Sequence, residues 1–327
     1  MQIDNGPQTP FLVAPSVSLA VPTNLTHGDV PWHTLQVLVK STTETRNRWS
    51  PAQPSTRVVF TGLTVAAVAA WFPASKSVLI YGDSITEGVL TLGGSQHFDT
   101  DHNDASVVYS HALGPLLGAE MGIVGFGATG LSRGGSGGVP ALGVSWNQLW
   151  DGVPRAFSPQ PDLVVFVPRP AHASADAPEI KRATHPYTPN LPTYRFNEGT
   201  NDCGAPPAPC GIAPAMATVL NNVMGACPTA AIAVMQPCAF FFLLARAAPA
   251  VPAIQSHAPR PPYPAVNGAA TNALLSAIAT VNSPRVHFVN TTGFYSTAFG
   301  GGLHPTGPND VARVAPQLAA ALRPLLR

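Results

Sequence analysis

Four short motifs contain residue types that together can carry out nucleophilic chemistry, and they are spread along a chain of 327 residues. "GDSITEG" contains Ser84, "GFGATG" contains Gly127, "NEGTND" contains Asn201 and "GGLHP" contains His304. A serine hydroxyl is a poor nucleophile until a base takes its proton, and the oxyanion that then forms needs aimed hydrogen-bond donors. Judged singly, these residues are better explained as a turn or cap serine, a turn glycine, a capping asparagine and an ordinary histidine.

From Lys76 onward, short apolar runs alternate with segments of helical spacing. The runs are "SVLIYG", "GAEMGIVGFG", "PDLVVFV", "AAIAVMQP" and "RVHFVN", and the helical segments between them include "SVVYSHALGPLLGAE", "APAMATVLNNVMGA" and "AATNALLSAIATV". This alternation predicts an α/β domain with a parallel sheet, whose functional residues lie at the carboxyl ends of strands. Ser84 follows the first run. His304 precedes a predicted terminal helix with an apolar stripe at Val311, Val314, Leu318, Leu322 and Leu325.

The first 75 residues have a different pattern. "WHTLQVLVKST" and "TRVVFTGLTV" are rich in β-forming residues, and the stretch between them is polar and contains proline. We therefore expect a small all-β module at residues 1–75 and the α/β domain at 76–327.

Composition limits the partners. Charged residues make up 10% of the chain and the net charge is +1, so no electrostatic attraction to nucleic acid is expected. The most apolar segment, from Pro228 to Ala245, is interrupted by Gln236 and Pro237, and we read it as a buried strand and a loop or short helix, with no transmembrane segment. The chain begins without a signal-peptide pattern, so the protein is either intracellular, or secreted with part of its N-terminus missing here.

The cysteines at positions 203, 210, 227 and 238 have no metal-binding spacing. They can form two disulfides in any of three pairings, or they can be free buried thiols.

The ordered set of motifs resembles the SGNH hydrolases, also called the GDSL esterase and lipase family. The resemblance implies a three-layer, flavodoxin-like α/β fold, with Ser84 as nucleophile, His304 as base, and the Ser84 amide, Gly127 and Asn201 as oxyanion donors. It implies that no metal or cofactor is needed. The N-terminal strands resemble the jelly-roll module of carbohydrate esterase family two, which implies removal of acetyl groups from a carbohydrate.

The chain departs from the family pattern at two places. The family usually has an aspartate three residues before the histidine, and Gly301 stands there in this chain. Some members manage with a Ser–His dyad and a backbone carbonyl on the imidazole. The second departure is an insertion from Val167 to Phe196, read either as a surface excursion or as translated non-coding sequence.

Three further interpretations are open. Trp146 and Trp150 are four residues apart and are expected to share one face of a helix or turn, where they either stack on sugar rings or, as we prefer, belong to the core. A lipase or lysophospholipase on the same fold is an alternative activity. A carbohydrate-binding protein that keeps the fold and has lost turnover is the alternative from another class.

Overall fold

The computed structural model describes residues 2–3, 35–44, 46–51, 56, 58, 74–93, 100–167, 212–236, 264–294, 304–305, 307 and 310–326. Its centre is a five-stranded parallel sheet in the order β4-β3-β7-β8-β9. The strands are β3 (Lys76–Gly82), β4 (Ala119–Gly125), β7 (Leu163–Phe166), β8 (Ala231–Met235) and β9 (Val286–Val289). All five apolar runs of the sequence therefore form strands of one sheet, as predicted.

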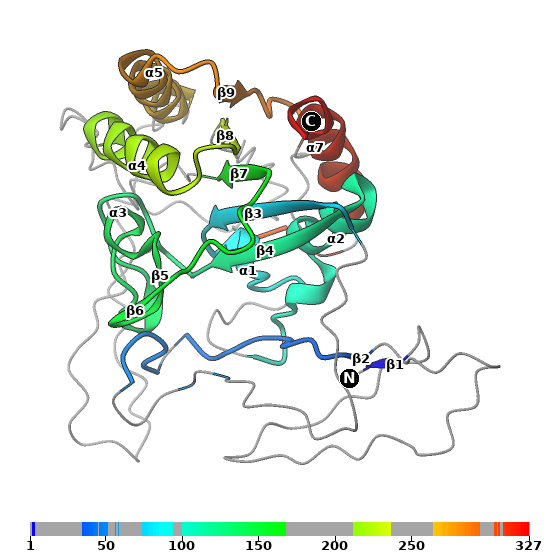
Figure 1. Ribbon diagram of the computed structural model, residues 1–327. Helices are drawn as coiled ribbons and strands as arrows, with labels where there is room; N and C mark the ends of the chain where they lie inside the picture. The colour runs from blue at the N-terminus through cyan, green and yellow to red at the C-terminus, as the bar shows by residue number, and fades with distance from the viewer. Residues whose placement is uncertain are drawn as a thin grey trace, which may run out of the picture.

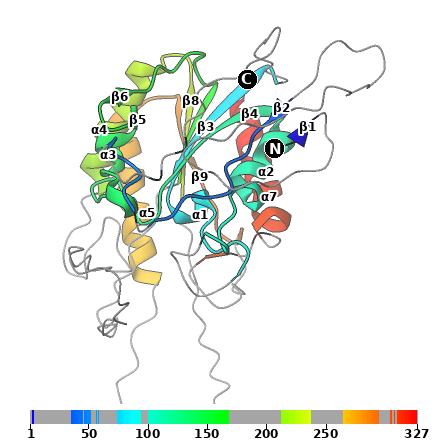
Figure 2. The ribbon, with the colours of Figure 1, turned by 90° about the horizontal axis from the view of Figure 1, so that it is seen from below.

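Helices cover both faces of the sheet (Figures 1 and 2). On one face lie α4 (Ile212–Ala226), α5 (Pro264–Val281) and the short α3 (Leu142–Ser145). On the other lie α2 (Tyr109–Leu117) and α7 (Ala315–Leu322), which follows a π-helical turn, η3 (Asp310–Val314). The described part of the molecule therefore has three layers, as the resemblance implied, around the parallel sheet that the alternation of strands and helices predicted.

The sheet is buried on both faces because successive residues of a strand point to opposite sides and both sides are apolar. In β3, Leu79 and Tyr81 join the core under α4 and α5, whereas Val78 and Ile80 join the core under α2 and α7. The terminal helix contributes Val314, Leu318 and Leu322 to the second core, with Val311 and Leu325 partly buried. The predicted apolar stripe thus ties the end of the chain to the sheet.

Little of the predicted N-terminal module lies within the described residues. β1 (Gln2–Ile3) pairs antiparallel with β2 (Leu35–Gln36), and most of the second predicted strand lies outside the described residues. The segment 40–49 packs directly on the α/β domain. The Ala105 amide donates to the Lys40 carbonyl at 2.8 Å, and Trp49 is buried with its ring edge-on to Phe126.

Two smaller expectations can also be compared with the structure. Cys227 is a free, buried thiol, so the pairing of all four cysteines in two disulfides is wrong; the other three lie outside the described residues. Among the described helices, none has both the length and the apolar character needed to cross a membrane.

Candidate active site

Ser84 lies where strand β3 gives way to the one-turn helix α1 (Ser84–Glu87). Asp83 caps this turn, and its Oδ1 accepts the Ile85 amide at 3.0 Å. A Cβ at Gly82 would lie 1.9 Å from Thr86 Oγ1, so only glycine leaves room for that side chain. Thr86 Oγ1 in turn is 2.7 Å from Tyr109 Oη on α2. The residues around Ser84 in "GDSITEG" thus hold its side chain in a fixed, buried turn.

His304 contacts Ser84 although 220 residues separate them in the sequence. The distance between His304 Nε2 and Ser84 Oγ is 2.8 Å, and both side chains are buried, with 6% and 5% of their surface exposed. The loop that carries His304 is held by the Gly307 amide, which donates to the Thr91 carbonyl at 2.8 Å. If Nε2 accepts the serine proton, the neutral imidazole carries its own proton on Nδ1.

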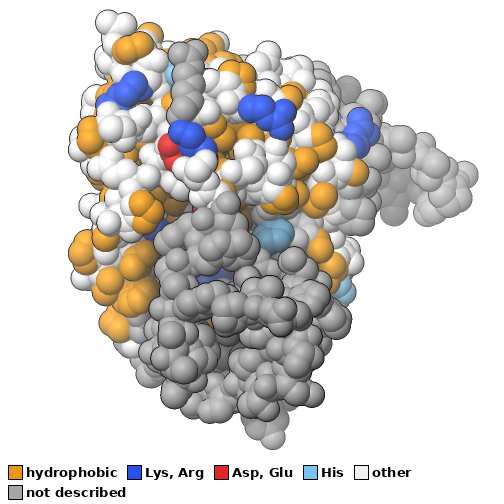
Figure 3. Space-filling view, turned by 45° about the vertical axis from the view of Figure 1, so that its right-hand side comes forward, with side chains coloured by type: hydrophobic (Ala, Val, Ile, Leu, Met, Phe, Trp, Pro, Cys, Tyr) orange, Lys and Arg blue, Asp and Glu red, His pale blue; other side chains and the backbone are white. Residues whose placement is uncertain are grey.

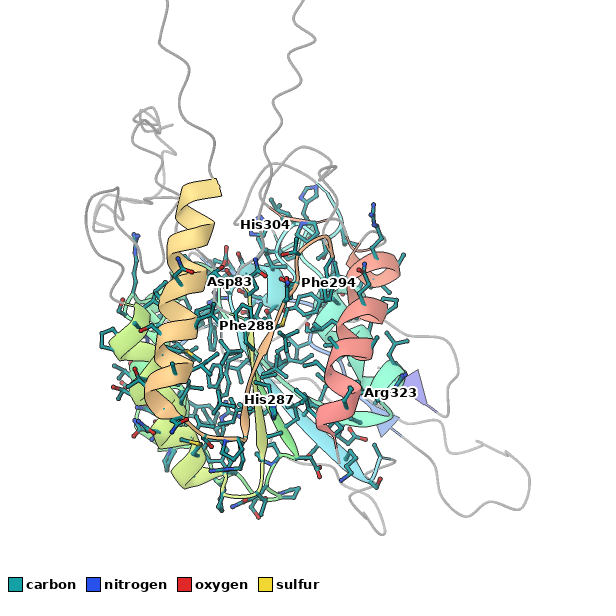
Figure 4. All side chains as sticks on the ribbon, turned by 90° about the horizontal axis from the view of Figure 1, so that it is seen from above. Asp83, His287, Phe288, Phe294, His304 and Arg323 are labelled. Carbon is teal, nitrogen blue, oxygen red and sulfur yellow. The ribbon has the colours of Figure 1, made fainter. Side chains whose placement is uncertain are left out.

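The pair lies at the carboxyl end of the parallel sheet. Figure 4 shows His304 and Asp83 toward one end of the sheet, with His287, at the start of β9, toward the other. This is the edge at which ligands bind in open α/β sheets. The structure therefore brings together the two residues predicted as nucleophile and base, at the predicted edge.

Gly127 follows β4 in a tight loop beside α1, but its amide is already engaged. The Gly127 N–H donates to Glu87 Oε2 at 2.7 Å, and the Gly127 carbonyl accepts the Ser136 amide at 2.8 Å. A Cβ at Gly127 would lie 1.6 Å from Glu44 Oε1, which explains why glycine is required there. An amide has a single proton, so the Gly127 N–H can serve an oxyanion only by leaving Glu87.

A buried charged cluster surrounds this loop, and the sequence analysis did not identify it. Arg48 donates from Nη1 and Nη2 to the Glu87 carboxylate, and from Nη2 to Glu44 Oε1 at 3.4 Å and Ser136 Oγ at 2.6 Å. The Ser136 hydroxyl donates to Glu44 Oε1 at 2.9 Å. The signal available in the sequence was the spacing of Glu44 and Arg48, four residues apart, in a chain with few charges.

The cluster holds two carboxylates against one guanidinium, and both carboxylates are perturbed. Burial, followed by repulsion from Glu87, raises the pKa of Glu44 to about 7 against the opposing effects of Arg48 and Ser136. Burial also raises the pKa of Glu87, although Arg48 and the Gly127 amide oppose the shift.

Several predicted positions lie outside the described residues. These are Asn201, Gly301 and, apart from Val167, the insertion 167–196. Val167 is buried, and its amide donates to the Tyr81 carbonyl at 2.9 Å, so regular pairing with β3 continues up to that residue.

Trp146 and Trp150 do not share a face, so that prediction is wrong. The helix α3 ends at Ser145, and the chain then turns into β5 (Gln148–Trp150), which forms a hairpin with β6 (Val153–Pro154). Trp146 is buried in the core, where its ring stacks on Phe157 at 5.7 Å between centroids. The preferred core interpretation is therefore confirmed for Trp146, whereas Trp150 is half-buried in the hairpin.

The described surface carries few formal charges. In Figure 3, lysine and arginine side chains on the visible described surface stand apart and form no continuous patch. Within the described part of the chain, no three His, Cys, Asp or Glu side chains gather in a group able to hold a metal ion.

Comparison with known proteins finds relatives by structure. No family model matches the sequence, and no curated protein matches it. One similar structure is a carbohydrate esterase family 2 enzyme with a carbohydrate-binding domain from Corynascus thermopiles (Myceliophthora fergusii). It has a TM-score of 0.54 and 19% identity, over 79% of this chain and 69% of that one. Another is a family two carbohydrate esterase from Clostridium thermocellum in complex with cellohexaose, with a TM-score of 0.50 and 18% identity, over 79% and 67%.

At these identities the likeness concerns the fold, and it spans about two thirds of the length of those chains. This chain shares with them the fold that the ordered motifs implied, a parallel sheet between two helical layers. The chain therefore has the three-layer α/β fold that is found in these carbohydrate esterases.

Proposed function

We propose that the protein is a serine esterase that removes acetyl groups from a carbohydrate. The observation that carries the proposal is the contact of 2.8 Å between Ser84 Oγ and His304 Nε2 at the carboxyl edge of the sheet. The shared fold with carbohydrate esterases supports the substrate class, because the similar proteins are esterases of that kind. Fold likeness alone does not determine chemistry, so the Ser–His contact is the stronger support.

The reaction proceeds through an acetyl-enzyme. Ser84 Oγ attacks the ester carbonyl carbon while its proton passes to His304 Nε2, and the carbonyl electron pair moves onto oxygen. When the pair returns, the bond from carbon to the sugar oxygen breaks, and His304 gives its proton to that oxygen. Water then attacks the acetyl group, its proton moves through His304 to Ser84 Oγ, and acetic acid leaves.

The oxyanion donors in this proposal come from different segments. The Ser84 amide lies in the first turn of α1, where backbone N–H groups and the helix dipole favour negative charge. Asn201 supplies a side-chain amide in the assignment that the resemblance implies. The Gly127 amide joins them only if its hydrogen bond to Glu87 is given up.

The test is the hydrolysis of p-nitrophenyl acetate by the protein and by Ser84→Ala and His304→Ala. We expect each substitution to lower kcat by about a thousandfold or more, since nucleophile and base act as one unit. Ser110→Ala is the matched control. Ser110 is also buried and makes one hydrogen bond, from Oγ to the Thr86 carbonyl at 3.0 Å, but it makes no contact with His304 in the structure. Its kcat should stay within about threefold of the parent value.

Equal rates for the parent protein and Ser84→Ala would contradict the enzyme proposal, and sugar binding without turnover would then favour the binding protein. Faster hydrolysis of long-chain than of acetyl p-nitrophenyl esters would point to the lipase alternative. Release of acetate from acetylated xylan, measured alongside, tests the carbohydrate substrate directly.

A further inference from the structure

Arg48 belongs to the N-terminal segment, yet its side chain enters the α/β domain beside the site. The side chain is 3% exposed, and the guanidinium carbon lies 5.3 Å from the ring centroid of Phe126, the residue before Gly127. Arg48 Nε also donates to the Ser136 carbonyl at 3.3 Å, and its backbone amide donates to the Gly137 carbonyl at 3.0 Å. The side chain is thus held along its whole length and cannot move independently of the loop.

The partners of Arg48 hold both polar groups of Gly127. Glu87, which receives the guanidinium, accepts the Gly127 N–H at 2.7 Å. Ser136, which receives the same guanidinium, donates its amide proton to the Gly127 carbonyl at 2.8 Å, and its Oγ lies 3.2 Å from that carbonyl while its hydroxyl proton is shared with Glu44. The direction of the peptide groups on either side of Gly127 therefore depends on two residues that Arg48 fixes.

Glu87 also connects this arrangement to the nucleophile. It is the last residue of α1, the turn that Ser84 begins, and its amide donates to the Asp83 carbonyl at 2.9 Å. A Cβ at Gly125 would lie 2.6 Å from the Glu87 amide nitrogen, so the end of β4 lies directly against this turn. Glu87 is consequently shared between the turn that carries Ser84 and the loop that carries Gly127.

We propose that Arg48 is a positioning residue for ester hydrolysis: by holding Glu87 and Ser136, it sets the Gly127 loop relative to the turn of Ser84. The proposal rests on the proposed esterase function. It predicts that the N-terminal segment contributes to turnover through the contacts of Arg48 with Glu87 and Ser136.

Arginine suits this place because its planar guanidinium has several donors in a fixed geometry. Lysine would keep the charge but could not reach Glu87, Glu44 and Ser136 together. Two charged groups contact Arg48: Glu44 on its own segment and Glu87 on α1. A third, Asp83, lies near Glu87. The neutral neighbours of Arg48 are Ser136 and Phe126. Loss of the guanidinium leaves two buried carboxylates without their counter-charge, and misplacement of catalytic parts by about 1 Å can cost on the order of a hundredfold in rate.

The experiment compares kcat and KM for p-nitrophenyl acetate in Arg48→Gln and Arg48→Lys with those in Arg285→Gln. Arg285 is the control because it too makes several hydrogen bonds, although it is only partly buried whereas Arg48 is buried. It donates to the carbonyls of Cys227, Ala230 and Met224, near the start of β9 at the opposite end of the sheet. Thermal melting of each variant gives the fraction of protein that is folded, and the rates are compared per folded molecule.

We expect Arg48→Gln to lower kcat by about thirtyfold with KM within about twofold, Arg48→Lys to recover part of that loss, and Arg285→Gln to keep kcat within about threefold. If Arg48→Gln loses no more kcat than Arg285→Gln at equal folded fraction, Arg48 is only structural and the proposal is overturned. Equal rates for the parent protein and Ser84→Ala would overturn the esterase function, and the proposal for Arg48 with it. If activity depends on Ser84 but not on Arg48, only the proposal for Arg48 fails.

A second variant keeps the test decisive if Arg48→Gln does not fold. Glu87→Gln preserves the side-chain shape and an acceptor for the Gly127 amide, but it removes the charge that Arg48 holds. We expect kcat to fall about tenfold, and in a folded Arg48→Gln/Glu87→Gln double variant we expect no loss beyond that of the worse single variant. Unchanged kcat in Glu87→Gln, or losses that multiply in the double variant, would show that Arg48 does not act through Glu87.

Discussion

Glu44 is a buried residue whose ionised form is disfavoured by this fold. Its carboxylate is 6% exposed and shares one guanidinium with Glu87, and burial raises its pKa from 4.5 to about 7. Its carboxylate also occupies the space that any side chain at position 127 would need. Glu44 therefore affects the loop by its bulk as well as by its charge.

This carboxyl group should make stability depend on pH. Between about pH 4.5 and about pH 7 the folded protein holds a proton that the unfolded chain has released, so the free energy of unfolding falls as the pH rises through this window. The full effect is on the order of 3 kcal/mol. Glu44→Gln cannot titrate, so urea unfolding should show a smaller loss of stability from about pH 5 to about pH 8 than in the parent protein. Identical pH slopes in the two proteins would contradict this assignment.

At this scale the sequence predicts that Ser84 and His304 come together, because each lies in a short motif with local physical meaning, and the structure shows their contact. Gly82 and Asp83 are required by the turn itself, and they mark it in any chain that folds this way. Arg48 carries no such mark. Its role arises from a contact with Glu87 across 39 residues, and nothing in the sequence around either residue reports that contact.

Among the elements, β4 and α1 lie in close backbone contact near the site. Gly125 is paired with Gly82 in the sheet, and the backbone of Glu87 lies against it with no room for a side chain. Gly122, in the same strand, has a different environment: a Cβ there would meet Leu79 Cδ1 at 3.1 Å, at the end of a flexible side chain.

Alanine at these two positions should therefore have different effects. Gly125→Ala must push the backbone of α1 away, and we expect it to cost about 2 kcal/mol or more and to lower esterase activity. Gly122→Ala should cost less than about 1 kcal/mol, since a side-chain adjustment of Leu79 relieves the contact. Urea unfolding and p-nitrophenyl acetate hydrolysis measure both effects, and equal losses in the two variants would refute the argument from backbone contact.

The elements that the sequence predicts correctly are strands with both faces buried in the core and helices with one buried, apolar face. The strands of the sheet and the helices α2, α4 and α5 show this in runs and stripes of apolar residues. The Trp146–Trp150 prediction failed because spacing alone cannot show where a helix stops: α3 ends at Ser145, and Trp150 belongs to a hairpin strand. The turn at Asp310–Val314 is π-helical, a local widening that an apolar stripe does not reveal.

For the molecule as a whole, the N-terminal segment and the α/β domain are joined by buried contacts. The Trp49 carbonyl accepts the Asp151 amide at 3.2 Å, and the Trp49 ring packs edge-on against Phe126. Together with the charged pair of Arg48 and Glu87, these contacts argue that the described part of the predicted module is not an independent unit.

Removal of residues 1–73 should therefore lower both the melting temperature and kcat, by at least as much as Arg48→Gln alone. A synthetic peptide of residues 37–51, added in excess, should restore part of the activity, whereas the same peptide with Arg48→Gln should not. A truncated protein with full activity would show instead that the first 75 residues form a separable module, as the sequence alone predicts.

The separation of Ser84 and His304 in the chain has a consequence for how the protein is made. The ribosome produces the serine 220 residues before the histidine that would activate it, and η3 and α7, which pack the end of the chain onto the sheet, come later still. A nascent chain can form β3, the turn at Ser84 and the contact with Arg48 while it still lacks a base. Turnover would then begin only when the last segment is in place. In a translation reaction, the esterase activity would therefore be proportional to the number of completed chains.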